Sequence, residues 1–392
     1  MTRIPRDKEN DYTDAMMAAR RDFATEQSGT VLHHVGQTSI DPALLPGNIE
    51  QAMGAAQVPI GLAGPLLVHG EHIDGEVFVP MATTEGTLVA SYNRGMRLLR
   101  ECGGVTVTIV ERYMQRAPVF HFDGARDARD FGVWLDANFD GVKRAAETTT
   151  SVGKLSHIEK YSVGAMLYTR MNFTTGDAAG QNMCGKAAFA ACQWIAEAYK
   201  GPLKGYTLSG AIDTDKKHSQ LNTLHSRGAR VVAEVVLEPE KTKQLMRATT
   251  QQLFRVRNVS HTGGMLAGTS SNGLHAANAL AALFIATGQD AANVAESQAS
   301  ISYVDLRDDG SLYWSLTLPS LIMATFGGGT GLPTQRECLD MMGCVGEENG
   351  KGMVGRLLEI TAATVLAGEL SLSSAIVAGD WVSSHDELGR NR

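Results

Sequence analysis

A glycine-rich loop between a strand-like segment and a helix-like segment constrains the fold of this chain more than any other feature. Met166–Phe173 has the composition of a strand, and Ala187–Tyr199 has that of a helix. Between them lies Thr174-Thr-Gly-Asp-Ala-Ala-Gly-Gln-Asn-Met-Cys-Gly-Lys. Small residues that lead into a helix leave backbone N–H groups unpaired at the positive end of the helix dipole. The stretch therefore predicts a phosphate-binding turn, and a tight turn without a ligand is the alternative.

The same loop disfavours two common nucleotide-binding folds. Gly180-Gln-Asn-Met-Cys-Gly-Lys-Ala comes within one residue of the P-loop pattern, but Ala187 stands where that pattern needs a hydroxyl group to hold magnesium. An ATP-dependent enzyme is therefore disfavoured. No G-x-G-x-x-G follows a strand-like segment, which also disfavours a standard Rossmann dinucleotide fold.

The elements around the loop predict an α+β fold with an inserted domain. Asp127–Asp136 and Val142–Thr148 are helical in composition, while Val105–Glu111 and Lys204–Thr207 are strand-like. We expect a helical N-terminal segment at 1–53, a large domain at 54–117 and 220–392, a small inserted domain at 118–207, and a connecting loop at 208–219.

The large domain is expected to combine a hairpin with long helices. Ile301–Leu306 and Leu312–Leu318 flank an Asp-Gly turn and predict the hairpin. Gln57–Leu67 alternates Pro and Gly with apolar residues, which suits irregular backbone or an edge segment better than a central strand. Helices are expected at Asp11–Glu26, Asn48–Gly54, Thr242–Val256, Leu274–Thr287 and Met353–Ala378, with a loop at Ser260–Gly273.

Composition excludes several classes of protein. The 35 Lys and Arg residues against 42 Asp and Glu residues give a net charge of -7, which argues against a general nucleic-acid or membrane-surface binder. The first ten residues do not have the pattern of a secretory signal, and no run approaches the ~18 apolar residues that a membrane helix needs. The 5 cysteines include no C-x-x-C pair, so we expect reduced thiols, no zinc or other metal site, and a cytoplasmic protein.

Four charged or titratable residues have ordinary structural explanations when each is taken alone. Glu85, between threonines and a glycine, suits a helix start, where the dipole favours an acid. Lys216 follows Asp215 in what is usually a solvated turn, and Asp290 suits a helix cap. His385 in the polar C-terminal stretch is usually surface decoration. Only their combination along the chain favours a catalytic role.

In this order and at these separations, the motifs resemble the hydroxymethylglutaryl-CoA reductases from about Asn48 to His385. The Asp-Lys-Lys loop and the late Ser-His pair look like the class I arrangement, in its soluble prokaryotic form. The matching segments are Val58-Pro-Ile-Gly-Leu-Ala-Gly-Pro-Leu, Pro80-Met-Ala-Thr-Thr-Glu-Gly, Thr175-Gly-Asp-Ala-Ala-Gly-Gln-Asn-Met, Thr214-Asp-Lys-Lys, His275-Ala-Ala-Asn, Gly288-Gln-Asp-Ala-Ala, Gly327-Gly-Gly-Thr and Ser384-His385.

The resemblance implies two successive hydride transfers from NADPH, with NADH as the alternative, that convert hydroxymethylglutaryl-CoA to mevalonate and free CoA. It also implies a large substrate domain, a ferredoxin-like small dinucleotide domain, and a homo-oligomer, dimer or tetramer, whose active site lies between subunits. No nucleic acid, membrane or metal partner is implied.

The same resemblance gives four residues catalytic roles. Lys216 would stabilise the oxyanion that hydride addition to a thioester produces. His385 would protonate the CoA thiolate, because its pKa suits that task near neutrality. Glu85 would protonate the mevaldehyde oxygen, although an ordinary Glu with a pKa of about 4.3 is ionised at pH 7. Asp290 would raise the pKa of Glu85 and stabilise the Lys216 ammonium, which makes the three a coupled unit.

Binding roles also follow from the resemblance. Substrate would contact polar residues of the large domain and the connecting loop, and apolar residues near the C-terminus: Arg116, Ser209, Asp215, Lys217, Arg257, His275, Asn278, Leu372, Ala375 and Ile376. The dinucleotide would contact the two glycine-rich loops: Gly176, Asp177, Ala178, Ala179, Gly180, Gln181, Asn182, Met183, Gly327, Gly328, Gly329 and Thr330.

Two departures from the family pattern leave alternatives open. Ala211 replaces an Asn and Arg257 a Lys of animal members, and Arg keeps the charge but not the geometry. The arginine that helps animal members hold the 2′-phosphate of NADPH is missing from Thr150-Ser-Val-Gly-Lys, where Ser151 and Lys154 are the candidate substitutes. The alternatives are an NAD-dependent relative that oxidises mevalonate and an inactive relative that only binds CoA or nucleotide.

Overall fold

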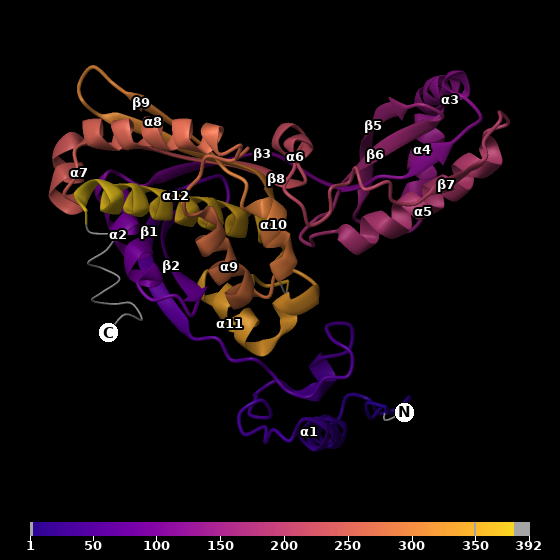
Figure 1. Ribbon diagram of the computed structural model, residues 1–392, viewed down its shortest axis with the longest axis horizontal. Helices are drawn as coiled ribbons and strands as arrows, with labels where there is room; N and C mark the ends of the chain where they lie inside the picture. Colours follow the sequence, from indigo (N-terminus) through magenta and orange to yellow (C-terminus); the bar gives the residue numbers. More distant parts are fainter. Residues whose placement is uncertain (1–2, 349, 380–392) are drawn as a thin grey trace.

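The computed structural model describes residues 3–348 and 350–379, so His385 lies outside the described residues. Figure 1 shows two lobes, one holding most of the chain and one smaller, with an N-terminal segment that extends away from both. The lobes have separate hydrophobic cores. The larger core combines residues from Ala63 to Val107 with residues from Ala229 to Leu370, and the smaller core is built from Met114 to Ile195 together with Ile322.

One long strand, β3 (Val105–Arg116), joins the two lobes. Its first part pairs antiparallel with β8 (Gly228–Leu237), from Thr106 to Tyr113. Its last three residues pair instead with β6 (Met166–Thr174) of the smaller lobe. The strand order through this joint is β7 (Gly205–Thr207), β4 (Val119–His121), β6, β3, β8, β10 (Leu312–Leu321) and β9 (Ile301–Leu306). Residues at the end of β3 and in the chain that returns to β8 therefore lie where the lobes meet.

The larger lobe buries long apolar helices against its strands. The 25-residue helix α12 (Val354–Ala378) is buried along most of its length and packs against α2 (Leu88–Glu101), as Figure 1 shows. The remaining elements of this lobe are β1 (Ile60–His69), β2 (Asp74–Ala82), α6 (Gln220–Leu224), α7 (Pro239–Met246), α8 (Thr250–Leu266), α9 (Ala276–Thr287), η2 (Ala291–Asn293), α10 (Val294–Ser297), β9 (Ile301–Leu306), β10 (Leu312–Leu321), η3 (Gly328–Gly331) and α11 (Pro333–Met341).

The smaller lobe packs three helices on four strands. Its elements are β4 (Val119–His121), α3 (Ala125–Ala137), α4 (Phe139–Glu147), β5 (Lys154–Val163), β6, α5 (Gln181–Ala198) and β7 (Gly205–Thr207). Aromatic rings fill its core, where Phe120 and Phe131 lie 4.8 Å apart between ring centroids. The expected boundaries of this lobe and its ferredoxin-like description stay predictions.

The N-terminal segment depends on one buried arginine. Helix α1 (Asp14–Ser28) begins at Thr13, whose hydroxyl accepts the Met16 N–H, and 3-10 helix η1 (Pro42–Leu44) follows. Arg20 is 2% exposed, and its guanidinium donates to the backbone carbonyls of Pro5, Asp11 and Ala52. Few apolar residues are buried in this segment, so these hydrogen bonds supply much of its order.

Most expected elements are present, and three expectations were wrong. Asn48–Gly54 is not helical. The expected helix Thr242–Val256 is two helices, because Arg247 takes a left-handed φ of 54° between α7 and α8. Helix α8 then continues to Leu266, through half of the expected loop. Glycines at 263 and 264 made that stretch resemble a loop, but it continues the helix that begins at Thr250.

One described helix, α12, is long and apolar enough to cross a membrane, and 83% of its apolar window is buried inside the protein. A core helix of a soluble protein meets the same criterion.

Candidate active site

The loop between β7 and α6 has a strained backbone that a buried asparagine supports. Ala211, Thr214 and Lys216 all have positive φ, at 65°, 54° and 56°. Such residues cost free energy and persist only where the surroundings fix them, typically at functional sites. Here Asn222 accepts the Thr214 hydroxyl at 2.5 Å and donates to the Lys217 carbonyl at 3.2 Å. The loop is thus held in one shape.

This shape brings Lys216 to Asp290. The Lys216 Nζ lies 2.7 Å from Asp290 Oδ2, and each side chain is 43% exposed. The hydrogen bond to Asp290 raises the pKa of the lysine. Asp290 also accepts the Ala292 N–H and so caps η2. Asp290 therefore both caps η2 and pairs with Lys216. From the sequence alone, a helix cap and an active-site acid were alternative roles for this residue.

The other polar residues of the loop bind protein partners. Ser209 Oγ donates to Asp213 at 3.0 Å, and Arg116 Nη1 donates to the same carboxylate at 3.1 Å. Asp213 is 2% exposed. Lys217 is exposed and donates to the Asp215 carbonyl. Arg116 and Ser209 are thus oriented from beneath by Asp213, which sequence reasoning missed.

Asp215 is held by Arg227, another residue that sequence reasoning missed. Arg227 Nη2 lies 2.5 Å from Asp215 Oδ1, and its Nε lies 3.2 Å from Glu296 Oε1. Gln181, at the start of α5, donates to Asp215 at 3.2 Å and to Asn293 at 3.0 Å. The glycine-rich loop therefore meets the Lys216 loop directly.

The glycine-rich loop has the geometry of an anion site. Gly176 and Gly180 have positive φ, and α5 begins at Gln181 with no side-chain cap. The first-turn N–H groups of this 18-residue helix, including those of Asn182 and Met183, thus face outward at its positive end. Cys184 in the same turn is buried, which raises the pKa of its thiol to about 12, so it is a packing residue.

The second glycine-rich stretch lies beside the first. The Thr325 N–H donates to the Asp177 carbonyl at 3.0 Å. Gly327 and Gly328 have positive φ, and a Cβ on Gly288 would lie 2.2 Å from the Gly329 carbonyl oxygen. Because Gly288 precedes Asp290 by two residues, both candidate dinucleotide loops converge on the Lys216–Asp290 pair.

Glu85 precedes α2 in the sequence, but in the folded chain it lies beside the first turn of α9. Its backbone N–H donates to Thr83 Oγ1, and its carboxylate accepts Asn278 Nδ2 at 2.7 Å. Both residues were predicted for the site, although their pairing was not. Thr87, which begins α2, has a φ of 71°. The chain around Glu85 is thus a second strained segment beside predicted site residues.

A buried network of polar side chains supports the region around Glu85 and Asn278. The Glu369 carboxylate accepts the backbone N–H groups of Leu274 and His275 and thereby caps α9. Tyr92 Oη lies 2.5 Å from His275 Nδ1. Burial lowers the pKa of His275 to about 4, so the ring is neutral near pH 7. Arg257 is 3% exposed, donates to the Asn272 carbonyl and faces Glu369.

The three predicted apolar residues follow Glu369 on α12. Leu372 is half-buried, Ala375 is buried and Ile376 is exposed. Ser371 accepts Arg94 Nε and contacts Ser91, so this end of α12 is fixed to α2. The apolar residues therefore belong with Glu85, on the α9 N-terminal side.

The predicted site residues thus form two groups at opposite ends of α9. Asn278, near the start of the helix, holds Glu85, and Asp290, just after its end, holds Lys216. About 14 Å of helix separates Asn278 from Thr287 at 1.5 Å per residue. Glu85, Lys216 and Asp290 were expected to act as one unit, and a single chain keeps Glu85 apart from the other two.

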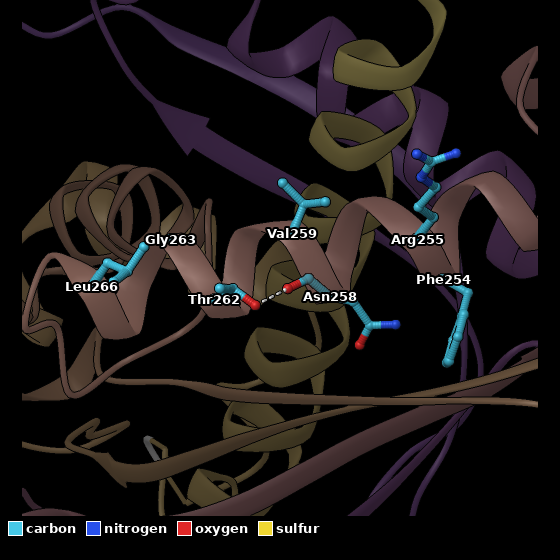
Figure 2. Close-up of a pocket in the computed structure, with 7 residues that line it drawn as sticks. All are labelled: Phe254, Arg255, Asn258, Val259, Thr262, Gly263 and Leu266. Atoms are coloured by element: carbon cyan, nitrogen blue, oxygen red, sulfur yellow. Dashed lines mark hydrogen bonds between the residues drawn. The ribbon is translucent and has the colours of Figure 1, made fainter.

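Two further features lie outside both groups. A groove of ≈ 720 Å³ runs along α8. Figure 2 shows the residues that line it: Phe254, Arg255, Asn258, Val259, Thr262, Gly263 and Leu266. Arg257 points inward from the same helix, away from this groove. Of the candidate phosphate ligands, Ser151 is exposed and Lys154 pairs with Glu147 at 3.3 Å.

Comparisons with known proteins show the family and the fold of the chain. The model of the hydroxymethylglutaryl-coenzyme A reductase family matches residues 16–390. The 3-hydroxy-3-methylglutaryl-coenzyme A reductase of Methanocaldococcus jannaschii is 41% identical over 95% of this chain and 92% of its own length. That of Aeropyrum pernix is 40% identical over 98% and 92%. A class II reductase from Streptococcus pneumoniae, solved with NADPH, is 18% identical with a TM-score of 0.68, over 90% of this chain and 92% of that chain, and so shares the fold.

Proposed function

The chain belongs to the hydroxymethylglutaryl-coenzyme A reductase family, and we propose that it reduces hydroxymethylglutaryl-CoA to mevalonate and CoA at a site completed by two copies of the chain. The observation that carries the proposal is the Lys216–Asp290 pair beside both glycine-rich loops. It puts a fixed cation where a dinucleotide and a carbonyl group can meet.

The chemistry follows from the charges. Hydride addition to the thioester carbonyl leaves an oxyanion, and an ammonium held in place by Asp290 needs no reorganisation to stabilise it. An exposed ion pair of this kind contributes less than about 1 kcal/mol to stability. The proposed role of the Lys216–Asp290 pair is therefore to hold the ammonium group in position for the reaction. Arg116 and Ser209, both oriented by Asp213, and Lys217 are positioned to bind the anionic end of the substrate.

The dinucleotide supplies the hydride when it is bound. The residues that would hold it are Gly176–Met183 and Gly327–Thr330. Their fit rests on the uncapped N-terminus of α5 and on the positive φ of Gly176, Gly180, Gly327 and Gly328, which together present backbone N–H groups to phosphate. We propose NADPH as the cofactor, because Ser151 and Lys154 lie beside this loop's strand and offer a hydroxyl and a cation.

Protonation of the aldehyde oxygen in the second reduction is the proposed role of Glu85. In one chain Glu85 is at the far end of α9 from Lys216, so both can serve one substrate only when a second copy brings its own Glu85 to the Lys216 loop. The same pairing would bring Asn278, His275, Leu372, Ala375 and Ile376 to the substrate. His385 is the proposed proton donor to the CoA thiolate.

We further propose a cytoplasmic homo-oligomer without a membrane or nucleic-acid partner, in keeping with the net charge of -7 and the burial of α12. Mevalonate oxidation with NAD is the reverse of the same chemistry and is the second candidate for the physiological direction.

One assay tests reaction and cofactor together. Purified protein is given hydroxymethylglutaryl-CoA and either NADPH or NADH, and cofactor oxidation, mevalonate and free CoA are measured. We expect about two dinucleotides oxidised per mevalonate and a higher kcat/KM with NADPH. Lys154→Ala should raise the KM for NADPH and leave that for NADH unchanged. Absence of turnover with both cofactors would overturn the proposed reaction.

A further inference from the structure

A fully buried ion pair lies directly beneath the Lys216 loop. Arg227, just before β8, and Glu296, in α10, are both 0% exposed, and Arg227 Nε lies 3.2 Å from Glu296 Oε1. A buried ion pair contributes little net stability, because desolvation offsets most of the attraction. This pair therefore needs an explanation other than stability.

The arginine of the pair holds a residue of the loop. Arg227 Nη2 donates to Asp215 Oδ1 at 2.5 Å, while Arg227 Nη1 donates to the Gln115 carbonyl in β3 at 3.2 Å. Glu296 accepts Arg227 Nε, and its charge is among those that raise the pKa of Lys216. Asp215 is thus tied to the buried pair directly, and the adjacent Lys216 follows it in the loop.

The backbone of Lys216 needs such a restraint. Its φ of 56° is disfavoured for a non-glycine residue, and its side chain is half-exposed. Without a restraint on the adjacent Asp215, the residue would relax and carry the ammonium away from Asp290. Glu296 holds Arg227 with a buried carboxylate, and within the described part of the chain its Oε2 has no hydrogen-bond partner. An unsatisfied buried oxygen is costly, which favours a positional role.

We propose that Arg227 and Glu296 are the positioning residues of Lys216, and that they fix its ammonium for hydride transfer without touching the substrate. This inference rests on the proposed function. It assigns the orientation of Asp215, and through it the position of Lys216, to Arg227, and it assigns the orientation of Arg227 to Glu296. A displacement of about 1 Å at a reacting centre can lower a rate by up to about 100-fold.

The first test compares two buried glutamates. In Glu296→Gln the side chain keeps its shape but loses the negative charge that holds the Arg227 guanidinium. We expect kcat to fall by about 10- to 100-fold, with the Kd for NADPH unchanged. Glu359 is the matched control, because it is also 0% exposed and accepts backbone N–H groups of Glu71, His72 and Ile73, none of which is a predicted site residue. Glu359→Gln should lower Tm but keep kcat.

The pH profile provides a readout that a structural role would not move. The charged groups that face Lys216 are Asp290, Asp215 and Glu296, and all three raise the pKa of the lysine. Removal of the Glu296 charge should therefore shift the alkaline limb of the kcat profile to lower pH. Glu359→Gln should leave that limb where it is in the wild type.

A double variant separates position from stability. Arg227→Met/Glu296→Leu replaces the pair by apolar groups of similar volume, which is often neutral or stabilising. We expect its Tm to recover relative to Glu296→Gln while kcat stays low. Recovery of kcat together with Tm, or wild-type kcat in Glu296→Gln, would overturn the inference. Inactivity of the wild-type protein would instead overturn the proposed function, so the two failures are distinguishable.

Discussion

At the scale of single residues, Glu85 shows how a local pattern and a site compete. Its position before α2 suits a helix-start acid, but its carboxylate binds Asn278, 193 residues later. The proposed proton transfer needs an acidic group at this position, and an amide of the same shape cannot supply the proton. We expect Glu85→Gln to keep the Asn278 contact and the fold, and to lower mevaldehyde reduction by at least about 100-fold.

The measurement for Glu85→Gln is the single-turnover reduction of free mevaldehyde with NADPH. Its control is Glu240→Gln on the first turn of α7, which should react at the wild-type rate. Full turnover in Glu85→Gln would remove this residue from the mechanism.

The buried His275 side chain should make the free energy of unfolding depend on pH. Burial lowers its pKa from about 6.5 to about 4, so between these values the unfolded chain binds a proton that the folded chain does not. Stability from this group is therefore complete above pH 6.5 and is lost as pH falls toward 4. Between pH 7.5 and 5.5 the loss should be about 1.4 kcal/mol.

Urea unfolding at those two pH values, for the wild type and His275→Asn, checks this. The wild type should lose more unfolding free energy on acidification than the variant. Equal losses in the two proteins would assign the pH dependence to other groups.

The residues that could be predicted from sequence are those in motifs. Lys216, Asp290 and Asn278 stand in specific segments, and the Lys216–Asp290 pair was expected. Asp213 and Arg227 were missed because a buried charge has no local signature: each lies in a polar, glycine-containing stretch that is typical of a surface turn. Only the contacts reveal them.

At the scale of elements, the crossing of α2 and α12 depends on two glycines. A Cβ on Gly95 would lie 1.9 Å from the Ala367 carbonyl oxygen, and one on Gly368 would lie 2.4 Å from the Tyr92 ring. The same crossing positions Ser371 and the apolar residues that follow it. Gly95→Ala should destabilise by about 1–3 kcal/mol and raise the KM for hydroxymethylglutaryl-CoA.

Gly263→Ala in α8 is the matched control, because nothing lies within 4 Å of its Cβ position. It should stabilise the protein by up to about 1 kcal/mol through helix propensity. Thermal unfolding of both variants measures the contrast, and a Gly95→Ala protein as stable as the wild type would contradict the packing argument.

Elements with a clear period or turn could be predicted, and those set by tertiary contacts could not. The β9–β10 hairpin follows from its Asp-Gly turn, and α12 from its apolar composition. The break between α7 and α8 depends on the left-handed Arg247, which no glycine or proline marks. Strand β1 forms despite its Pro and Gly residues because β2 pairs with it along its length.

At the scale of the whole molecule, the separation of Glu85 from Lys216 predicts complementation between two inactive variants. In a mixed pair of Glu85→Gln and Lys216→Ala chains, one site has both defects and the other has none. The isolated mixed pair should therefore have about half of wild-type activity per chain. The measurement is turnover by the mixed species, purified after co-expression with two different tags.

Lys216→Ala mixed with Asp290→Asn is the control, because both changes affect the same group and every site stays defective. A site contained within one chain would give no recovery in either mixture.

The length of α9 has a kinetic consequence. If each chain owns two partial sites and no complete one, turnover per chain is not a constant of the protein but depends on how much of it is present. At protein concentrations below the dissociation constant of the dimer, the reaction velocity should rise with the square of the protein concentration. Dilution alone should therefore abolish activity.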